Sequence, residues 1–277
     1  MDGFERLRLL VGEDGMTRLQ RARVLLFGVG GVGSFAAEAL VRGAIGHLTL
    51  VDHDTVRASN LNRQLLALHS TLGRPKVEVM AERLRDICPE CDLVAQPAKL
   101  TPETVGAWLG EGWDYVVDAI DDGEAKLALL AECARRQQRV VSSMGAANKL
   151  LPGEVRTVDI SRSRQCPLAR RMRKYLRRLG IERGITVVYS EELPLRLLGG
   201  AGDFQGQRPE KEGEKRPQGT ISYLPALFGL HCAAAVIRHL LADLPFVHRG
   251  ETPPTSRRAS LRTPARIRQT GSGQPSG

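Results

Sequence analysis

The sequence predicts an α/β protein with a doubly wound, mainly parallel sheet, helices on both faces of the sheet, and a smaller C-terminal extension. Two observations lead to this prediction. Short apolar runs alternate with amphipathic stretches over residues 23–143, and a glycine-rich turn directly follows the first apolar run. The chain has 277 residues, of which 42% are hydrophobic, so it can bury a sizeable core and is too apolar to be disordered throughout.

The spacing of apolar residues gives the expected elements in order. Strands are expected over 23–28, 47–52, 114–119 and 139–143, with helices between them over 34–42, 74–87 and 124–136. Beyond Pro152 we expect strands over 154–160 and 185–190, a helix from Pro167 between them, and a last helix over 224–241. We expect one folded domain over 1–248, including a mobile loop at 199–218, and a disordered basic tail at 249–277.

The net charge of +9 is concentrated in two segments. Residues 162–183 carry nine Lys and Arg against one Glu, and residues 249–277 carry six Arg against one Glu. Local basic surfaces are typical of proteins that bind a polyanion such as RNA, although a solvated helix face has the same composition.

Cysteine usage and apolar runs indicate the compartment. Five cysteines are an odd number and residues 1–10 do not resemble a signal peptide, so we expect a reducing cytoplasm. The longest apolar run, 223–237, contains His231, so we expect a buried helix without stable membrane insertion. Cys88 and Cys91 form a single CxxC pair, and because a closed structural zinc site needs four ligands, we expect no zinc there.

A phosphate-binding turn is predicted between the first strand and the first helix. The sequence GVGGVG places Gly28, Gly30, Gly31 and Gly33 where backbone N–H groups and the helix N-terminus can face an anion. Asp52 ends the next strand, where its carboxylate can accept hydrogen bonds from ribose hydroxyls. By itself this pattern is equally typical of an NAD-dependent oxidoreductase.

The residues after Asp52 favour a triphosphate over a dinucleotide, because three phosphates need several cations and amide donors. These polar residues are Asp54, Ser59, Asn60, Asn62, Arg63 and, at a helix start, Lys76. Asp121 and Asp122 follow the strand at 114–119, on the ligand side of such a sheet. A carboxylate there can bind a Mg²⁺ that bridges phosphates, or it can cap the next helix.

Four motifs in this order, GVGGVG, LVDHDTVRASNLNRQ, GRPKVE and VVDAIDD, resemble the ubiquitin-activating-enzyme superfamily in its bacterial ThiF/MoeB/HesA branch. The resemblance extends over about residues 4–190, with weaker support at 219–241. It implies a Rossmann-like fold, a homodimer, and adenylation of a carboxylate by ATP with Mg²⁺ and release of pyrophosphate.

The resemblance also implies roles for individual residues. Asp52 would hold the ribose, Lys76 the α-phosphate and Asp121 the Mg²⁺, while Asn60 and Arg63 would contact the β- and γ-phosphates. Arg6 aligns with an arginine that reaches into the ATP site of the partner subunit. Gly3 stands where relatives commonly carry a second arginine, which weakens the expectation for Arg6.

The second half of the chain resembles the tRNA threonylcarbamoyladenosine dehydratases, in the motifs SSMGAANK (142–149), VDI (158–160), CPLA (166–169) and GTISYLP (219–225). This resemblance implies adenylation of the threonyl carboxylate of the modified adenosine beside the tRNA anticodon. The neighbouring carbamoyl group then closes an oxazolone ring and expels AMP. It also suggests sulfur-transfer proteins as partners. The alternatives are an adenylyltransferase for a ubiquitin-like sulfur carrier, whose members usually have two CxxC pairs, and a non-catalytic RNA-binding protein.

Two features of the helix from Pro167 remain open. Cys166 either accepts an acyl group as a thioester or is a small residue at the start of the helix, and we favour the second interpretation. The expected buried stripe consists of Leu168, Met172, Tyr175, Leu176 and Leu179. The remaining face, which could neutralise tRNA phosphates or simply be solvated, consists of Arg170, Arg171, Arg173, Lys174, Arg177 and Arg178.

Overall fold

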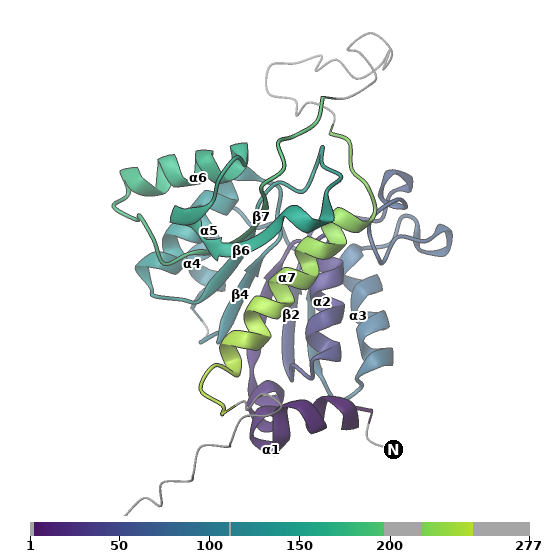
Figure 1. Ribbon diagram of the computed structural model, residues 1–277. Coiled ribbons are helices and arrows are strands. Elements are labelled where there is room, and N and C mark those ends of the chain that lie inside the picture. Colours follow the sequence, from purple (N-terminus) through teal and green to yellow (C-terminus); the bar gives the residue numbers. More distant parts are fainter. Residues whose placement is uncertain (1–2, 111, 197–217, 246–277) are drawn as a thin grey trace, which may run out of the picture. The chain divides into compact units, whose positions relative to one another are not determined.

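The computed structural model describes residues 3–110, 112–196 and 218–245 (Figure 1). By its contacts the chain divides into residues 1–244 and residues 245–277, and only Pro245 of the second unit is described. Nearly all of the expected mobile loop at 199–218 and the whole expected tail at 249–277 lie outside the described residues.

Seven strands form one sheet in the order β3-β2-β1-β4-β5-β7-β6. Neighbouring strands are parallel except β6 and β7, which are antiparallel, so the predicted mainly parallel sheet is confirmed. Strand β3 was not expected, because as an edge strand it is only partly buried and lacks a continuous apolar run. The strands are β1 (Arg23–Phe27), β2 (His47–Val51), β3 (Asp92–Gln96), β4 (Tyr115–Asp118), β5 (Val140–Ser143), β6 (Val155–Asp159) and β7 (Thr186–Ser190).

The described helices lie on both faces of this sheet (Figure 1). Helices α1 and α4 were not expected: Gly12 has φ +70° and interrupts α1, and α4 has only four residues. The helices are α1 (Glu5–Arg21), α2 (Gly33–Arg42), α3 (Lys76–Ile87), α4 (Val105–Trp108), α5 (Gly123–Arg135), α6 (Pro167–Arg178) and α7 (Tyr223–Leu240).

Alternate residues of the central strands build two apolar cores. In β1, Val24 and Leu26 pack with α2, α3 and α7, whereas Leu25 and Phe27 pack with α4, α5 and α6. All four side chains are almost fully buried, which stabilises the fold by about 1.5–3 kcal/mol for each. The doubly wound arrangement predicted from the sequence is therefore confirmed.

Helix α7 is the one described helix that is long and apolar enough to cross a membrane by length and composition. Its residues Phe228, Cys232 and Val236 are fully buried in the same core as α2, as expected for a core helix. Gly229 permits this packing, because a Cβ there would lie 2.3 Å from the carbonyl oxygen of Val32.

Helix α6 differs from its predicted pattern at two residues. Leu179 was expected in the buried stripe, but it is 59% exposed because the helix ends at Arg178. Arg173 was expected on the exposed basic face, but it is half-buried and its guanidinium donates to the carbonyl oxygen of Ser163 at 2.8 Å.

Candidate nucleotide-binding site

The glycine turn between β1 and α2 requires its glycines. Gly28 has φ +86°, and a Cβ there would lie 2.7 Å from the carbonyl oxygen of Ala119. At Gly33, the first residue of α2, a Cβ would lie 1.7 Å from the carbonyl oxygen of Gly28. Gly31 is close to Pro225, and Gly30 faces Gln64. The backbone of the turn therefore packs directly against neighbouring backbone. This packing places the N-terminus of α2 at the carboxyl end of β1.

Asp52, which directly follows β2, fixes this turn. Its Oδ2 accepts a hydrogen bond from the N–H of Val29 at 2.6 Å, and its Oδ1 accepts one from the N–H of Asp54 at 2.8 Å. Each carboxylate oxygen keeps a second lone pair. Asp52 is only half-buried, so the carboxylate can bridge the turn and still accept a ligand hydroxyl.

Lys76 and Asp54 form an ion pair beside the turn. Lys76, the first residue of α3, is 5% exposed, and its Nζ lies 2.9 Å from Asp54 Oδ2. Burial would raise the pKa of Asp54, but the hydrogen bond and charge of Lys76 outweigh it and lower that pKa. The N–H of Asp54 donates to Asp52, which in turn accepts the N–H of Val29, so the buried ammonium is linked to the glycine turn through these two carboxylates.

Ser59, Asn62 and Arg63, three other polar residues of this segment, line a cavity of about 510 Å³, whereas Asn60 does not. Arg63 donates to the carbonyl oxygen of Ser59 at 2.7 Å and to Oδ1 of Asn62 at 3.0 Å. Asn62 in turn donates to the carbonyl oxygen of Thr220, close to the start of α7. Asn60 is buried, and its Oδ1 accepts the N–H of Arg57. The cavity is lined by Ala58, Ser59, Leu61, Asn62, Arg63, Gln218 and Thr220.

The two carboxylates after β4 differ in their surroundings. Asp122 caps α5 by accepting the N–H groups of Glu124 and Ala125 at 2.9 and 3.1 Å. Asp121 is exposed on the same turn. Mg²⁺ usually binds one or two protein carboxylates together with phosphates and waters. One carboxylate, that of Asp121, is therefore enough to contribute to a magnesium site.

Among the described residues, Asp52, His53 and Asp54 bring three metal-ligating groups within 4.8 Å of one another. The carboxylate of Asp52 already accepts two backbone N–H groups, and Asp54 pairs with Lys76. Because the oxygens of Asp52 and Asp54 already bind backbone N–H groups and the Lys76 ammonium, this cluster is a weaker candidate than Asp121 for a metal that bridges phosphates.

Two further groups of the site were missed by sequence reasoning. Gln64 is 7% exposed; its Nε2 lies near Gly30, and its Oε1 is buried without a hydrogen-bond partner among the described residues. An unpaired buried acceptor is costly, which indicates that a ligand or water completes the site. The second is Lys126, whose Nζ donates to Asp118 Oδ2 at 2.6 Å and to the carbonyl oxygen of Ser143 at 3.0 Å. No local pattern reveals either feature, because both depend on residues brought together by the sheet.

Arg6 is not brought to the other predicted site residues within this chain. It is exposed on α1, which packs at the amino ends of the strands: Gly46, just before β2, donates to the carbonyl oxygen of Leu19. The glycine turn lies at the carboxyl ends of the strands, on the opposite side of the sheet from α1 (Figure 1).

Cys166 precedes Pro167 at the start of α6 and is 3% exposed. The side chain of Lys149 is also buried; its Nζ donates to the carbonyl oxygen of Ser190 at 2.9 Å, and burial lowers the pKa of Lys149. A thiol enclosed in this way is poorly placed to accept an acyl group from a bulky substrate.

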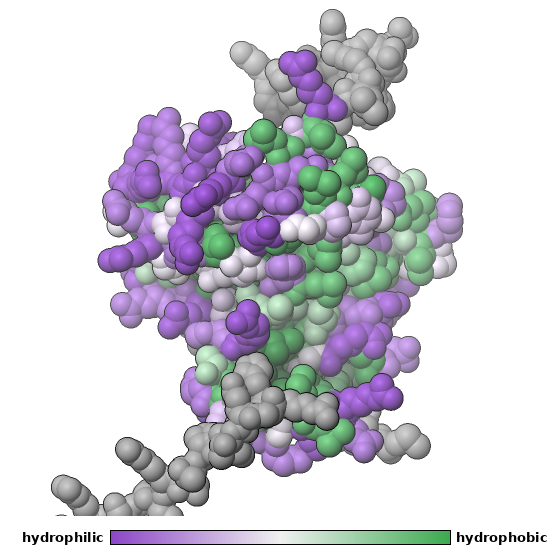
Figure 2. All heavy atoms as spheres, viewed as in Figure 1, coloured by the Kyte–Doolittle hydropathy of each residue, from purple (hydrophilic) through white to green (hydrophobic). Residues whose placement is uncertain are grey.

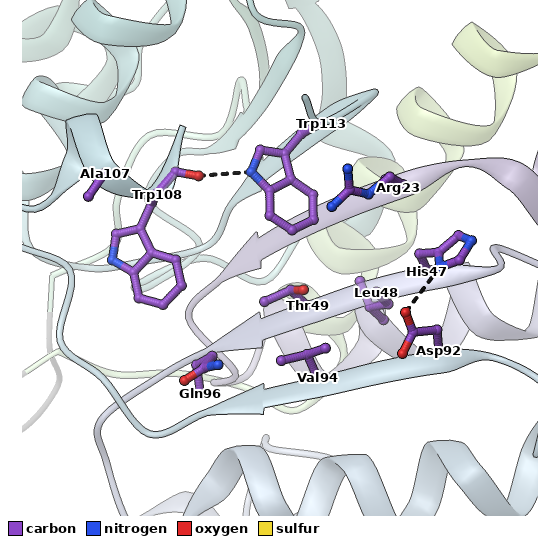
Figure 3. A pocket seen from close by; sticks show the side chains of 10 residues that line it. All are labelled: Arg23, His47, Leu48, Thr49, Asp92, Val94, Gln96, Ala107, Trp108 and Trp113. Carbon is purple, nitrogen blue, oxygen red and sulfur yellow. Dashed lines mark hydrogen bonds and ion pairs between the residues drawn. The ribbon is translucent and has the colours of Figure 1, made fainter. Parts of the chain in front are cut away.

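A second cavity, of about 190 Å³, lies on the β1–β3 half of the sheet (Figure 3). Trp108 and Trp113 form one side, and Trp113 Nε1 donates to the carbonyl oxygen of Trp108 at 2.8 Å. Arg23 lies 5.0 Å from the ring of Trp113, and His47 pairs with Asp92 at 3.1 Å. None of the predicted site residues lines this cavity.

Comparison with known proteins identifies the family. Residues 4–269 match the ThiF family. The tRNA threonylcarbamoyladenosine dehydratase of Bacillus subtilis is 40% identical over 242 residues, which cover 87% of this chain and 95% of that protein. The crystal structure of E. coli TcdA, a tRNA N6-threonylcarbamoyladenosine dehydratase, in complex with ATP has a TM-score of 0.76 and 32% identity, covering 86% of this chain and 93% of that one. The E. coli molybdopterin-synthase adenylyltransferase is 37% identical, but over only 50% of this chain and 54% of that protein. The chain therefore belongs to the ThiF family.

Proposed function

We propose that this protein is an ATP-dependent tRNA threonylcarbamoyladenosine dehydratase. The observation that carries the proposal is the 40% identity to the B. subtilis dehydratase over nearly the full length of both chains. The site agrees with it, since the glycine turn, Asp52 and Lys76 lie together at the carboxyl ends of parallel strands, where such sheets bind nucleotides.

In the proposed reaction, the threonyl carboxylate attacks the α-phosphorus of ATP and pyrophosphate leaves. The buried ammonium of Lys76 stabilises the charge that develops on the α-phosphate, the electrostatic effect that dominates this chemistry. Asp52 orients the ribose, and Asn60 and Arg63 hold the β- and γ-phosphates. Mg²⁺ bound by Asp121 would supply further charge to the phosphates.

In the second step the carbamoyl oxygen attacks the activated carbonyl, a carbamoyl N–H loses its proton to solvent, and AMP leaves with the carboxylate oxygen. The sum is loss of one water, with its oxygen carried away on AMP. The attack is intramolecular, so the enzyme needs only to position the two groups. No enzyme thioester is required, in agreement with the burial of Cys166.

Activation of a sulfur-carrier protein is the second candidate. The similarity to the molybdopterin-synthase adenylyltransferase, limited to half of the chain, gives it weaker support. Cys88 and Cys91 are buried, and burial raises the pKa of both thiols, that of Cys91 to about 12. The pair supplies two of the four ligands that a closed structural zinc site needs.

A homodimer that shares its active sites is supported by α7. The outer face of this helix exposes Tyr223 and Leu230, and the hydroxyl of Tyr223 donates to the carbonyl oxygen of exposed Leu150. Figure 2 shows hydrophobic residues gathered around this helix. The amino end of α7 packs against the glycine turn through Pro225, and its carboxyl end is followed by Asp243, which pairs with Arg18 of α1. Antiparallel pairing of two α7 helices about a twofold axis would therefore bring α1 of the partner toward this glycine turn. We propose that Arg6 acts there, in trans.

The proposed tRNA substrate and the five described free cysteines agree with a cytoplasmic enzyme. Sulfur-transfer proteins remain proposed partners on the family resemblance alone.

Mass spectrometry of nucleosides tests the reaction. The protein is incubated with ATP, Mg²⁺ and tRNA that carries threonylcarbamoyladenosine, and we expect a nucleoside lighter by one water together with AMP. tRNA without the modification and the Lys76→Ala variant are the controls, and neither should yield product. An unchanged nucleoside, with AMP formed only when a carrier protein is added, would replace the dehydratase by the second candidate.

A further inference from the structure

The outward face of α6 is a continuous basic surface. At 3.6 residues per turn its exposed cations fall within an arc of about 120°. The opposite side is buried, with Ala169, Met172 and Leu176 at 0% exposure. Figure 2 shows strongly hydrophilic residues over this helix. The basic arc, as we name it, consists of Arg170, Arg171, Lys174, Arg177 and Arg178.

The basic arc has no acidic partners among the described residues. Two clusters elsewhere on the surface are neutralised in part by a carboxylate: Arg42 and Arg83 share Glu38, and Arg135 and Arg136 share Glu132. No such pair includes a member of the arc. Like charges three and four residues apart destabilise a helix, so the arc is a surface that an external anion would stabilise.

The half-buried Arg173, beside the arc, is repelled by the positive charges of two arc members. Burial lowers the pKa of its guanidinium first, and the charges of Arg177 and Arg170 lower it further. Cations that repel one another in this way form a field of positive potential rather than a network of internal ion pairs.

The arc reaches the candidate nucleotide site at one end. Arg171 Nη1 lies 3.6 Å from where a Cβ would stand at Gly123, the first residue of α5 after Asp121 and Asp122. The guanidinium groups of Arg171 and Arg178 lie 5.9 and 5.3 Å from the ring of Tyr175. These stacking contacts orient both arginines. The 12 residues of α6 extend over about 18 Å, enough to follow several phosphates of an RNA strand.

We propose that the basic arc of α6 binds the phosphates of the tRNA that flank the modified adenosine, with Arg171 nearest to the nucleotide. The inference rests on the proposed function, because it takes the substrate to be tRNA. A membrane surface fits less well, since an interfacial helix buries its apolar side in lipid and the apolar side of α6 is buried in the protein core.

Charge reversal tests the basic arc. Arg170→Glu with Arg177→Glu reverses two exposed members that do not reach Gly123. Arg85→Glu with Arg135→Glu makes the same change in net charge on exposed residues of α3 and α5. Binding of threonylcarbamoyladenosine-tRNA is measured by fluorescence anisotropy over a series of NaCl concentrations, and KM for tRNA, Kd for ATP and Tm are measured alongside.

The arc variant should bind tRNA at least about tenfold more weakly, and the salt slope of log K should fall by about 1–2 for the two lost phosphate contacts. Its KM for tRNA should rise while Kd for ATP stays unchanged, and the control variant should match the wild type in tRNA affinity, salt slope and KM, with only a small fall in Tm from the lost pair of Arg135 with Glu132. If reversal prevents folding, Arg170→Gln with Arg177→Gln should show the same change at about half the size.

Three outcomes would overturn the proposal. Unchanged tRNA affinity and salt slope in the arc variant, with normal turnover in the wild type, would refute the arc and leave the proposed function standing. A wild type that binds no tRNA but forms AMP with a carrier protein would refute both. Loss of binding to phosphatidylglycerol vesicles, with tRNA binding intact, would assign the arc to a membrane instead.

Discussion

Lys126 Nζ lies 2.6 Å from Asp118 Oδ2, and both side chains are shielded from solvent at the carboxyl end of β4. Ser142 of β5 also donates to Asp118 Oδ2, and Asp118 Oδ1 accepts the N–H of Ile120. A buried charge of this kind survives only because every partner is in place. The network fixes the turn after β4 on which Asp121 and Asp122 lie.

Replacing Lys126 by Met should therefore destabilise the protein by about 3–5 kcal/mol, because it leaves the Asp118 carboxylate buried without its counter-charge. Urea unfolding measures the loss. Arg135→Met, which breaks an exposed pair with Glu132, should cost no more than about 1 kcal/mol. The double variant Lys126→Met with Asp118→Asn should recover part of the stability, and equal losses in the single and double variants would count against a coupled pair.

The glycine turn gives a second prediction. Gly33→Ala places a methyl group 1.7 Å from the carbonyl oxygen of Gly28, so the turn must move. We expect a loss of about 3 kcal/mol or more in unfolding free energy, and loss of ATP binding by calorimetry in whatever fraction folds. Gly153→Ala is the matched control, since a Cβ there meets nothing within 4 Å and should change stability by less than about 0.5 kcal/mol. Normal ATP affinity in Gly33→Ala would remove the turn from the site.

The ion pair between Lys76 and Asp54 predicts a pH dependence of stability. The pKa of Asp54 is lowered from its usual 3.8, so its ionised form is stabilised in the folded state. This stabilisation is complete well above pH 3.8 and is lost as the pH falls through the lower pKa of the folded state. Unfolding free energies of the wild type and Lys76→Met should therefore differ at pH 6 and converge toward pH 2. A constant difference across that range would contradict the assignment. Asp54 is partly exposed, so we expect the pair to contribute about 1 kcal/mol to this difference.

Cys166→Ala should keep the ability to cyclise the substrate, because the thiol is buried at the helix start. The nucleoside assay with mass spectrometry measures turnover, and a thermal melt measures the fold, where we expect a cost of at most about 2 kcal/mol. A variant that folds with an unchanged melt and yet makes no product would restore the thioester route.

The shared active site predicts the behaviour of the oligomer. Leu230→Glu places a charge on the apolar face of α7 and should shift the protein from dimer to monomer in light scattering, whereas Leu179→Glu at the end of α6 should not. Arg6→Ala and Lys76→Ala should each be inactive. When they are mixed in equal amounts, about a quarter of the wild-type activity should return, because half of the dimers are mixed and one of their two sites is intact. No recovery on mixing, with subunit exchange demonstrated, would exclude a role in trans.

The sequence alone determined the order of strands and helices and the position of the phosphate-binding turn. Both follow from short-range patterns: apolar runs of strand length, a helical period, and glycines where strand meets helix. The same patterns missed β3, whose partly exposed edge carries no continuous apolar run. They missed α1 as well, where Gly12 interrupts the helix.

Tertiary structure decided which of these residues meet. Lys126 pairs with Asp118, the Oε1 of Gln64 is buried without a partner among the described residues, and Arg6 belongs to α1, which packs at the amino ends of the strands. These relationships depend on the strand order β2-β1-β4-β5, which brings together segments that are far apart along the chain. Burial then makes them energetically decisive, because a charge or amide removed from water must find its partner within the fold, and nothing in the local sequence specifies that partner.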